Sequence, residues 1–427
     1  MKDNVVSVIL WGQEVCKLTW RGGYKQQFGK LGSIVTFNPD YVSNGWDVDP
    51  IGPYNHSIYL VRQGLSDWCR AKEYEGLPRF LSGSLPDDWG NAVFSAWIES
   101  RNIKHSAINS VDKLEFIGKR GMGALEFVPA VYEGASVEDN LLIEELYDLS
   151  KLILKEREGI SLDIASNPGI KDLMAVGTSA GGAHPKAIVA INWNTGEIKS
   201  GQFLLPDSFT QYILKFKDSQ LWPTAEVEYA FYKMARQCGI IMENCRLITI
   251  EGDNHFLTER FDRKGGDKLH TATLQALNGE TYSYEELIRV CRKMRLPYAD
   301  LEQVFRRAVF NYLSGVCDDH DKNVSFILSR DGRWRLSPAY DLTFTVNFVN
   351  KFIGNRHAMS LSGEQRHVSK DQMLEFAEYG DIKNPSYIIE EVCDVVMGFE
   401  SIANELRIPA PATEIIKNHI TKQVGAL

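Results

Sequence analysis

The stretch "DDHDKN", residues 318–323, decides which fold is expected of this chain. Three acids, an imidazole, an ammonium group and an amide occupy its six positions. A helical stripe of apolar residues over 301–313 precedes it, and the strand pattern "VSFIL" (324–328) follows. The polar side chains therefore lie at a helix-to-strand junction. A plain surface loop is the alternative interpretation of these six residues taken alone.

The spacing around this stretch is typical of phosphoryl-transfer chemistry. Asp318 and Asn323 are five apart, as are the base and the metal-binding amide of a protein-kinase catalytic loop. A hairpin with the turn "RDG" (330–332) follows and leads to "SPAYD", so a second acid, Asp341, returns one hairpin later. Such a reaction needs one carboxylate for the attacking hydroxyl, and an amide oxygen with another carboxylate for Mg²⁺. A turn acid is the alternative for Asp341.

A kinase also needs a lysine on a strand. In "QYILKFK" (211–217), strand alternation places Lys215 on the face opposite three apolar residues. Lys217 shares that face, and an edge-strand lysine that discourages aggregation is the alternative. Either Glu226 or Glu228, on the following helical segment, is expected to pair with the lysine, and spacing does not choose between them.

Two glycine-rich segments are candidates for phosphate contacts. "GTSAGGAHPK" (177–186) precedes a strand pattern, and its glycines let backbone N–H groups approach phosphate oxygens. It is not a Walker A loop, because Lys186 does not directly follow the last glycine. "GKRGMG" (118–123) is a weaker signal, and a structural turn is favoured there. The chain contains no HExxH and no GxSxG motif, so zincin and serine-hydrolase chemistry are unsupported.

Composition limits the partners and the compartment. With 56 acidic and 47 basic residues the formal charge is −9, so DNA contact is expected to need a local basic patch or a basic partner. The seven cysteines show no CxxC spacing and are interpreted as reduced thiols. We find no long apolar run and no signal peptide, and we expect a cytoplasmic protein without a membrane span.

The order of patterns predicts the α+β class, as a two-lobed protein-kinase-like fold. Strand and hairpin patterns begin the chain, a helical stripe occupies 81–97, and strands return over 187–193 and 209–216. Helical patterns dominate after residue 224. We therefore expect an N-terminal α/β lobe over 1–218, divided into 1–110 and 111–218, and a mostly helical C-terminal lobe over 219–427.

Six motifs in order resemble the HipA-like serine/threonine kinases, the toxin halves of bacterial toxin–antitoxin pairs. They are "LPDDWG" (85–90), "GKRGMGALEF" (118–127), "TSAGGAHPKA" (178–187), "ERFDR" (259–263), "DDHDKN" (318–323) and "SPAYDL" (337–342). Together they span residues 85–342, and the ordered run is more specific than any single motif. Residues 1–110 would then correspond to the family's N-terminal subdomain, and 111–218 to the nucleotide-binding part.

The resemblance implies a set of site residues for ATP and Mg²⁺. The implied roles are a catalytic base at Asp318, Mg²⁺ ligands at Asn323 and Asp341, nucleotide-phosphate contacts at Lys215, His320 and Lys322, adenine contacts at Glu259 and Phe261, and a phosphate loop with Ser179, Gly181, Gly182 and Lys186. Ser179 matches the serine that the family autophosphorylates. A phosphate adds about −1.5 to −2 charges and would oppose nucleotide binding, which gives an off-switch.

The same resemblance implies partners. They are a protein substrate in translation, such as an aminoacyl-tRNA synthetase, and a small helix-turn-helix antitoxin through which DNA is contacted. The chain departs from the family at Asp319, where glycine is common, and at "HTAT" (270–273) after the hinge; Thr178 also offers a hydroxyl beside Ser179. A catalytically silent co-repressor and a small-molecule phosphotransferase on the same scaffold are the alternative functions.

Overall fold

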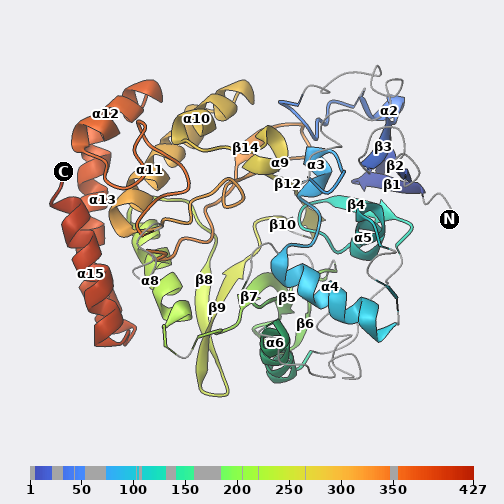
Figure 1. Cartoon of the computed structure of the whole chain (residues 1–427), viewed down its shortest axis with the longest axis horizontal. Helices are drawn as coiled ribbons and strands as arrows, with labels where there is room; N and C mark the ends of the chain where they lie inside the picture. The colour runs from blue at the N-terminus through green and yellow to red at the C-terminus, as the bar shows by residue number, and fades with distance from the viewer. Residues whose placement is uncertain are drawn as a thin grey trace.

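A computed structural model describes the chain from β1 near the N-terminus to the C-terminal helix. It describes residues 5–21, 32–42, 44–52, 74–101, 103–104, 108–130, 141–157, 184–203, 205–219, 221–264, 266–346 and 354–427. Figure 1 shows a mixed α and β architecture, in which an N-terminal sheet, a central sheet and a group of C-terminal helices follow one another along the longest axis. One continuous hydrophobic core contains buried residues from all three parts.

The N-terminal sheet joins the start of the chain to a strand more than a hundred residues later. Its order is β3-β2-β1-β4, all antiparallel, with β1 (Val5–Leu10), β2 (Gln13–Arg21), β3 (Gly32–Phe37) and β4 (Leu125–Val128). Val6, Val8 and Leu10 alternate inward along β1, as the hairpin pattern predicts. In the described part of the intervening chain lie the helices α2 (Pro39–Val42), α3 (Arg79–Ser82), α4 (Asp88–Ser100) and α5 (Ser110–Ile117).

The helical stripe expected over 81–97 is interrupted by a break between α3 and α4. Pro86 lies in the break, and Asp87 begins the second helix by accepting a hydrogen bond from the N–H of Gly90 at 3.3 Å. A proline lacks the N–H that a continuous helix needs, and an aspartate N-cap satisfies a free donor of the first turn. Pro86 and Asp87 therefore divide into two helices a segment whose apolar period alone predicts one.

The central sheet is antiparallel with the order β6-β5-β7-β9-β8. Its strands are β5 (Lys186–Ile191), β6 (Ile198–Ser200), β7 (Thr210–Lys215), β8 (Cys245–Ile250) and β9 (Asp253–Glu259). Helices α6 (Ile143–Arg157) and α8 (Thr224–Gln237) accompany it, and α8 packs against β8 and β9. The strands at 187–193 and 209–216 and the helix after 224 are as predicted.

The expected divisions at 110/111 and 218/219 both cut through a sheet. Strand β4 lies after residue 110 but pairs with β1, and β9 lies after residue 218 but pairs with β7. Strand pairing joins segments that are distant in the sequence, whereas composition and periodicity report only local pattern. Neither position is therefore a boundary between sheets.

The C-terminal part consists of helices around α11 and two small sheets. One sheet pairs β10 (Arg263–Lys264) with β11 (Asp267–Lys268). The other has the order β12 (His270–Thr273), β13 (Ser325–Leu328) and β14 (Trp334–Leu336). The helices are α9 (Leu274–Asn278), α10 (Tyr284–Lys293), α11 (Tyr298–Ser314), α12 (Lys370–Tyr379), α13 (Pro385–Met397), α14 (Phe399–Glu405) and α15 (Ala410–Val424). Helix α11 packs against α10, α12, α13 and α15, so the predicted apolar stripe at 301–313 is the centre of this part.

Three tryptophans connect the N-terminal sheet to the C-terminal part. The indole N–H of Trp11 donates to the carbonyl of Lys268 at 2.7 Å, and that of Trp46 to the carbonyl of Arg330 at 2.8 Å. In the other direction, Trp334 donates to the carbonyl of Asp47 at 2.9 Å. The turn between β13 and β14, which lies between the two candidate acidic loops, is thus fixed to the segment that follows α2.

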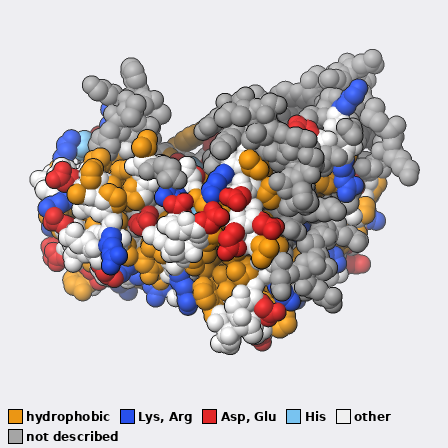
Figure 2. Space-filling view, turned by 90° about the horizontal axis from the view of Figure 1, so that it is seen from below, with side chains coloured by type: hydrophobic (Ala, Val, Ile, Leu, Met, Phe, Trp, Pro, Cys, Tyr) orange, Lys and Arg blue, Asp and Glu red, His pale blue; other side chains and the backbone are white. Residues whose placement is uncertain are grey.

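The described surface carries charged side chains of both signs (Figure 2). On the face drawn in Figure 2, acidic and basic side chains are interspersed in the middle of the molecule. Among the described residues we find no helix long and apolar enough to span a membrane.

Candidate active site

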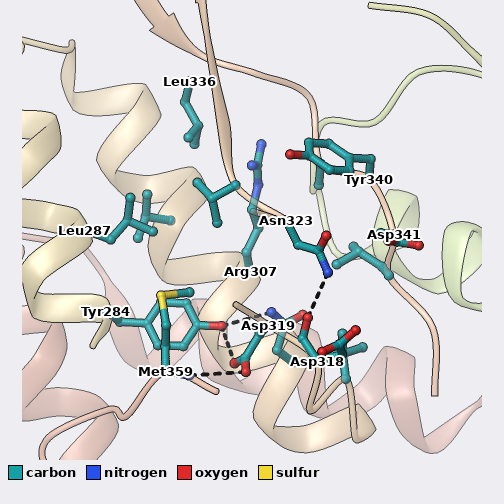
Figure 3. Close-up of a pocket in the computed structure, with 16 residues that line it drawn as sticks. Tyr284, Leu287, Arg307, Asp318, Asp319, Asn323, Leu336, Tyr340, Asp341 and Met359 are labelled. Atoms are coloured by element: carbon teal, nitrogen blue, oxygen red, sulfur yellow. Dashed lines mark hydrogen bonds between the residues drawn. The ribbon is translucent and has the colours of Figure 1, made fainter. Parts of the chain in front are cut away.

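Hydrogen bonds with the side chains of Thr345 and Asn323 hold the backbone around Asp318. Helix α11 ends at Gly315, whose φ of 84° gives the left-handed turn that starts the loop. The hydroxyl of Thr345 accepts the N–H of Cys317 at 2.7 Å and that of Asp318 at 3.0 Å. The side-chain amide of Asn323 donates to the carbonyl of Asp318 at 2.8 Å (Figure 3). The carboxylate of Asp318 is 62% exposed, so a fixed backbone presents an accessible acid.

Asn323 and Asp341 contribute oxygen atoms beside this acid. Because the Asn323 nitrogen is used on the Asp318 carbonyl, its oxygen is the atom left for a ligand. Asp341 follows β14 and has a φ of 58°, a left-handed conformation that aspartate tolerates better than most residues. Figure 3 shows Asp318, Asn323 and Asp341 around one small cavity. The two loops that the sequence singled out are therefore brought together.

Lys215, at the end of β7, lies between two carboxylates. Its Nζ is 2.6 Å from Oε1 of Glu228 on α8, and it also contacts Oδ1 of Asp341. Burial raises the pKa of Asp341, but Lys215 and Lys186 outweigh it and hold that pKa well below its usual value. Asp341 is therefore a charged carboxylate across the neutral range. One lysine connects the central sheet, helix α8 and the second acidic loop.

Lys217 and Glu226, the alternatives to Lys215 and Glu228 in the sequence, have other partners. Lys217 pairs with Asp253 at 2.5 Å. Glu226 accepts a hydrogen bond from the side chain of Asn254 at 2.8 Å. The geometry therefore selects Lys215 and Glu228 as the partners.

Lys186 lies beside Lys215 on the neighbouring strand. The two residues are register partners in the antiparallel pair of β5 and β7, so their side chains project from the same face of the sheet. Lys186 is 3% exposed, and burial lowers its pKa. The charge of Lys215 lowers this pKa further, whereas the nearby carboxylates of Asp341, Asp87 and Glu228 raise it.

The motif "LPDDWG" reaches the same region. The indole N–H of Trp89 donates to the carbonyl of Lys186 at 2.9 Å. Burial raises the pKa of Asp87 to about 6, and the positive charges of Lys186 and Lys322 oppose that shift. No sequence pattern pointed to a chemical role for this motif, but the structure places its acid, of intermediate pKa, near two of the implied phosphate-contacting lysines.

The side chains of the hinge residues make contacts within the protein. The Glu259 carboxylate accepts from the hydroxyl of Tyr212 at 3.3 Å and from the amide of Asn244 at 2.9 Å. The ring of Phe261 lies 5.7 Å, centroid to centroid, from that of Tyr340, directly before Asp341. The hinge segment therefore contacts the second acidic loop, while the Glu259 side chain is used within the protein.

The glycine-rich segment at 118–123 is a structural turn, as favoured. Asp262 accepts the N–H of Gly123 at 2.7 Å, and Arg263 donates to the carbonyls of Gly121 and Gly123 at 3.2 and 3.0 Å. Gly123 has a φ of 75°, and a Cβ there would lie 2.8 Å from the backbone nitrogen of Thr271. Only glycine fits this close approach.

His320 and Lys322 lie within the first acidic loop. The Nδ1 atom of His320 accepts the N–H of Lys322 at 3.2 Å, and its Nε2 is 3.7 Å from Oδ1 of Asp318. Lys322 is exposed, and its carbonyl accepts from the hydroxyl of Tyr340 at 2.8 Å. Ser179, Gly181 and Gly182 lie outside the described residues. The description resumes at His184, which contacts Asp218.

Two residues near Asp318 were missed by sequence reasoning as site residues. Thr345 is 27 residues from Asp318, and no local pattern points to its hydroxyl. Asp319 carried one signal, the departure from a glycine, and its contacts are described below. The cavity among these loops has a volume of about 30 Å³.

The donor set fits a magnesium ion that is bound mainly by phosphates. Among the described residues there is no group of three or more His, Cys, Asp or Glu side chains that would hold a metal by itself. Mg²⁺ in nucleotide sites is typically bound through one or two carboxylates together with phosphates and water. Asp341, with the amide oxygen of Asn323, supplies such a set.

Family comparison agrees with this geometry. The model of the HipA-like C-terminal domain matches residues 178–422, and that of the HipA N-terminal domain matches residues 6–128. The chain belongs to the HipA-like family. The C-terminal match contains Lys215, Asp318, Asn323 and Asp341, and the N-terminal match ends with β4, the last strand of the N-terminal sheet.

Two curated relatives match about half of this HipA-like chain. A Haemophilus influenzae protein described as "Putative kinase" is 27% identical over 233 residues, covering 49% of this chain and 66% of the relative. A Sinorhizobium fredii protein described as "Putative kinase Y4dM" is 24% identical over 237 residues, covering 50% of this chain and 58% of the relative. The match therefore spans less than two thirds of either relative.

A solved structure shares the fold over nearly the whole chain. The HipA of a Shewanella oneidensis toxin–antitoxin system, solved with HipB and operator DNA, aligns with a TM-score of 0.65 and 17% identity. The alignment covers 99% of this chain and 96% of that one. The HipA-like fold thus extends from the N-terminal sheet to the C-terminal helices.

Proposed function

We propose that this HipA-like chain is an ATP- and Mg²⁺-dependent kinase that phosphorylates serine or threonine hydroxyls of a protein. The observation that carries the proposal is the meeting of Lys215, Glu228 and Asp341 beside Asp318 and Asn323. Strand β7, helix α8 and the two acidic loops contribute a cation, its carboxylate partner and two oxygen ligands to one place. Phosphoryl transfer requires this combination of charges.

Each residue has a distinct task in this proposal. When bound, ATP supplies the phosphoryl group and Mg²⁺ neutralises charge on its phosphates. Asp318 orients the acceptor hydroxyl and accepts its proton, for which its exposed carboxylate is accessible. Asn323 and Asp341 hold the metal with their side-chain oxygens. Lys215, positioned by Glu228, presents its charge to the phosphates, and Lys186 adds a second charge on the same face.

The toxin role and its control are the finer part of the proposal. We infer an off-switch at Ser179, because a phosphate within the phosphate loop would repel the phosphates of ATP. We also infer a small helix-turn-helix antitoxin that contacts DNA for the complex, since the similar HipA was solved with HipB and operator DNA. The net charge of −9 agrees with DNA contact through a partner. The inferred substrate is a translation component such as an aminoacyl-tRNA synthetase.

Phosphate transfer from labelled ATP tests the catalytic assignment. The wild type and Asp318→Asn are incubated with Mg²⁺, and incorporation is followed by intact mass and peptide mapping. We expect phosphate on Ser179 in the wild type only, with ATP affinity retained in Asp318→Asn and transfer lowered by roughly three orders of magnitude. Ser179→Ala should keep transfer to a protein substrate while losing self-modification.

The same assay identifies the alternatives. ATP binding without transfer to any protein would favour a catalytically silent co-repressor. Turnover with a sugar or an aminoglycoside, but not with protein, would favour a small-molecule phosphotransferase. Wild-type rates in Asp318→Asn would contradict the proposed base, and phosphate outside residues 178–179 would contradict the proposed switch.

A further inference from the structure

Asp319 is a buried acid directly beside Asp318. Its side chain is 1% exposed, whereas that of Asp318 is 62% exposed. Figure 3 shows Asp319 turned toward Tyr284 and Met359, into the helical part of the protein. Two consecutive carboxylates therefore face different surroundings, and only one of them has a task in the proposed chemistry.

Four donors converge on the Asp319 carboxylate. Its Oδ2 accepts from the hydroxyl of Tyr284 at 2.7 Å and lies 3.0 Å from Nδ1 of His357. Its Oδ1 accepts the backbone N–H of Ala358 at 2.8 Å and that of Met359 at 3.4 Å. A buried carboxylate with such donors is well satisfied, and removing it leaves each donor without its acceptor.

The donors are themselves fixed to α11 and to the acidic loop. The hydroxyl of Tyr284 accepts from the amide of Asn311 at 2.9 Å. The ring of His357 stacks on Tyr312 with centroids 3.8 Å apart, and its Nε2 is 3.8 Å from Sγ of Cys317. The hydroxyl of Tyr312 also donates to the carbonyl of Met359 at 2.9 Å. Residues 357–359 are thus a rigid support rather than a loose loop.

The polypeptide that follows Asp341 therefore holds the acidic loop at two points. Thr345 accepts the backbone N–H of Asp318, and residues 357–359 bind the side chain of Asp319. The backbone of Ala358 also donates to the carbonyl of Cys317 at 3.1 Å. The position of the Asp318 carboxylate relative to Asp341 depends on both attachments. A displacement of about 1 Å at a reacting group can lower a rate by roughly 10²-fold.

We propose that Asp319 is a positioning residue for phosphoryl transfer. Its buried carboxylate binds residues 357–359 and Tyr284, and it thereby fixes the loop that presents Asp318. Asp319 does not touch substrate or nucleotide in this role, which rests on the proposed kinase function. A buried anchor to the segment that follows the second acidic loop therefore lies directly after the proposed base.

Steady-state kinetics of Asp319 variants of the full chain test this proposal. We expect Asp319→Ala to lower kcat by roughly 10²-fold, while the KM for ATP changes by less than about threefold, because the nucleotide contacts lie elsewhere. Asp319→Asn keeps an acceptor for the N–H of Ala358 and should recover about tenfold of that loss. Tyr284→Phe removes one donor and should lower kcat by about threefold.

A matched control separates positioning from general stability. Asp300 is another buried acid of this part, 4% exposed, and accepts from Arg335 at 2.8 and 2.9 Å and from the N–H of Leu336 at 3.0 Å. Asp300→Asn should lower the melting temperature with less than about a threefold change in kcat. A kcat for the folded Asp319→Ala protein that equals that of Asp300→Asn would overturn the proposal.

Two further outcomes keep the test decisive. If Asp319→Ala does not fold, wild-type kcat in both Asp319→Asn and Tyr284→Phe would overturn the positioning role. A fall in kcat with Asp319→Asn, at unchanged KM for ATP and in a protein that still loses transfer with Asp318→Asn, supports it. Normal transfer by Asp318→Asn would instead reject the proposed function itself, so the two failures are distinguishable.

Discussion

The charged clusters around Asp262 and around Lys215 differ in their exposure and in their partners. Asp262 and Arg260 have side chains that are 0% exposed, and Asp262 accepts from Arg260, Arg263 and the N–H of Gly123. In the second cluster, Lys215 is 18% exposed and Asp341 is 35% exposed. The first cluster is closed by protein donors, whereas the second has charges that solvent or a ligand can reach.

Exposure, rather than charge, distinguishes the closed cluster from the one to which we assign phosphoryl transfer. Burial raises the pKa of Asp262, but the two arginines outweigh it and hold that pKa well below its usual value. The pKa of Asp341 is lowered in the same way by lysines, so a perturbed pKa does not distinguish the two clusters. What distinguishes the clusters is their exposure, because solvent or a ligand can reach the charges around Lys215 but not those around Asp262. The variants below change one cluster at a time.

The largest effect is expected from Lys215→Met. Removing the cation that contacts both Glu228 and Asp341 should lower kcat/KM for ATP-dependent transfer by roughly 10³–10⁴-fold, which is about 4–5 kcal/mol of transition-state stabilisation. Transfer of labelled phosphate measures it. Lys217→Met is the matched control, because Lys217 lies two residues away and pairs with Asp253. A loss in the control as large as that in Lys215→Met would contradict the assignment.

Asp262→Asn should instead act on stability. Leaving two buried arginines without their carboxylate should lower the free energy of unfolding by about 3 kcal/mol, since breaking a buried ion pair leaves uncompensated charge. Urea unfolding measures the change. Asp331→Asn breaks an exposed pair with Arg333 and should leave the midpoint nearly unchanged. An unfolding midpoint of Asp262→Asn equal to that of the control would show that the closed cluster adds no stability.

How far the sequence predicted the site depends on the distance over which each feature is specified. The spacing of Asp318, Asn323 and Asp341 predicted two loops that meet, and alternation along β7 predicted which face Lys215 shares. Local pattern could not choose Glu228 over Glu226, because both lie on α8 and only the packing of α8 on the sheet decides. Helix and strand positions were largely predictable, because the period of the apolar residues is a local property of the sequence.

Contacts between segments far apart in sequence were not predictable. Thr345 and residues 357–359 reach the acidic loop from 27 to 40 residues away, and no periodic pattern links them to it. The sheets likewise pair β1 with β4 and β7 with β9, so expected divisions at 110 and 218 do not follow the sheets. These features depend on tertiary packing, which single-sequence patterns do not encode.

Unlike the groups of the two charged clusters, His270 is a buried ionisable group without a charged partner among the described residues. It is 2% exposed, and neither ring nitrogen has a hydrogen-bond partner among the described residues. Burial lowers its pKa from 6.5 to about 4. Between these values the unfolded chain binds a proton that the folded chain does not. The free energy of unfolding should therefore fall as pH falls below 6.5, by roughly 2 kcal/mol at pH 5.

Urea unfolding at several pH values tests this dependence. His270→Phe should flatten the slope between pH 6.5 and 5 without abolishing it, because burial also lowers the pKa of His419 to about 4. An unchanged slope in His270→Phe would show that the His270 ring is not held neutral by burial. The expected direction is the opposite of that for a histidine stabilised by a carboxylate.

The smallest effect is expected from Glu228→Gln, which changes one partner within the cluster of Lys215, Glu228 and Asp341. The amide keeps an oxygen for Lys215 but removes one of its two negative partners, so Lys215 should stay near Asp341 with a weaker restraint. We expect kcat/KM for ATP-dependent transfer to fall by roughly tenfold, about 1.4 kcal/mol. Glu226→Gln, two residues earlier on α8, should stay within about twofold because its partner is Asn254. Equal losses in the two variants would mean that charge on α8, rather than contact with Lys215, supports transfer.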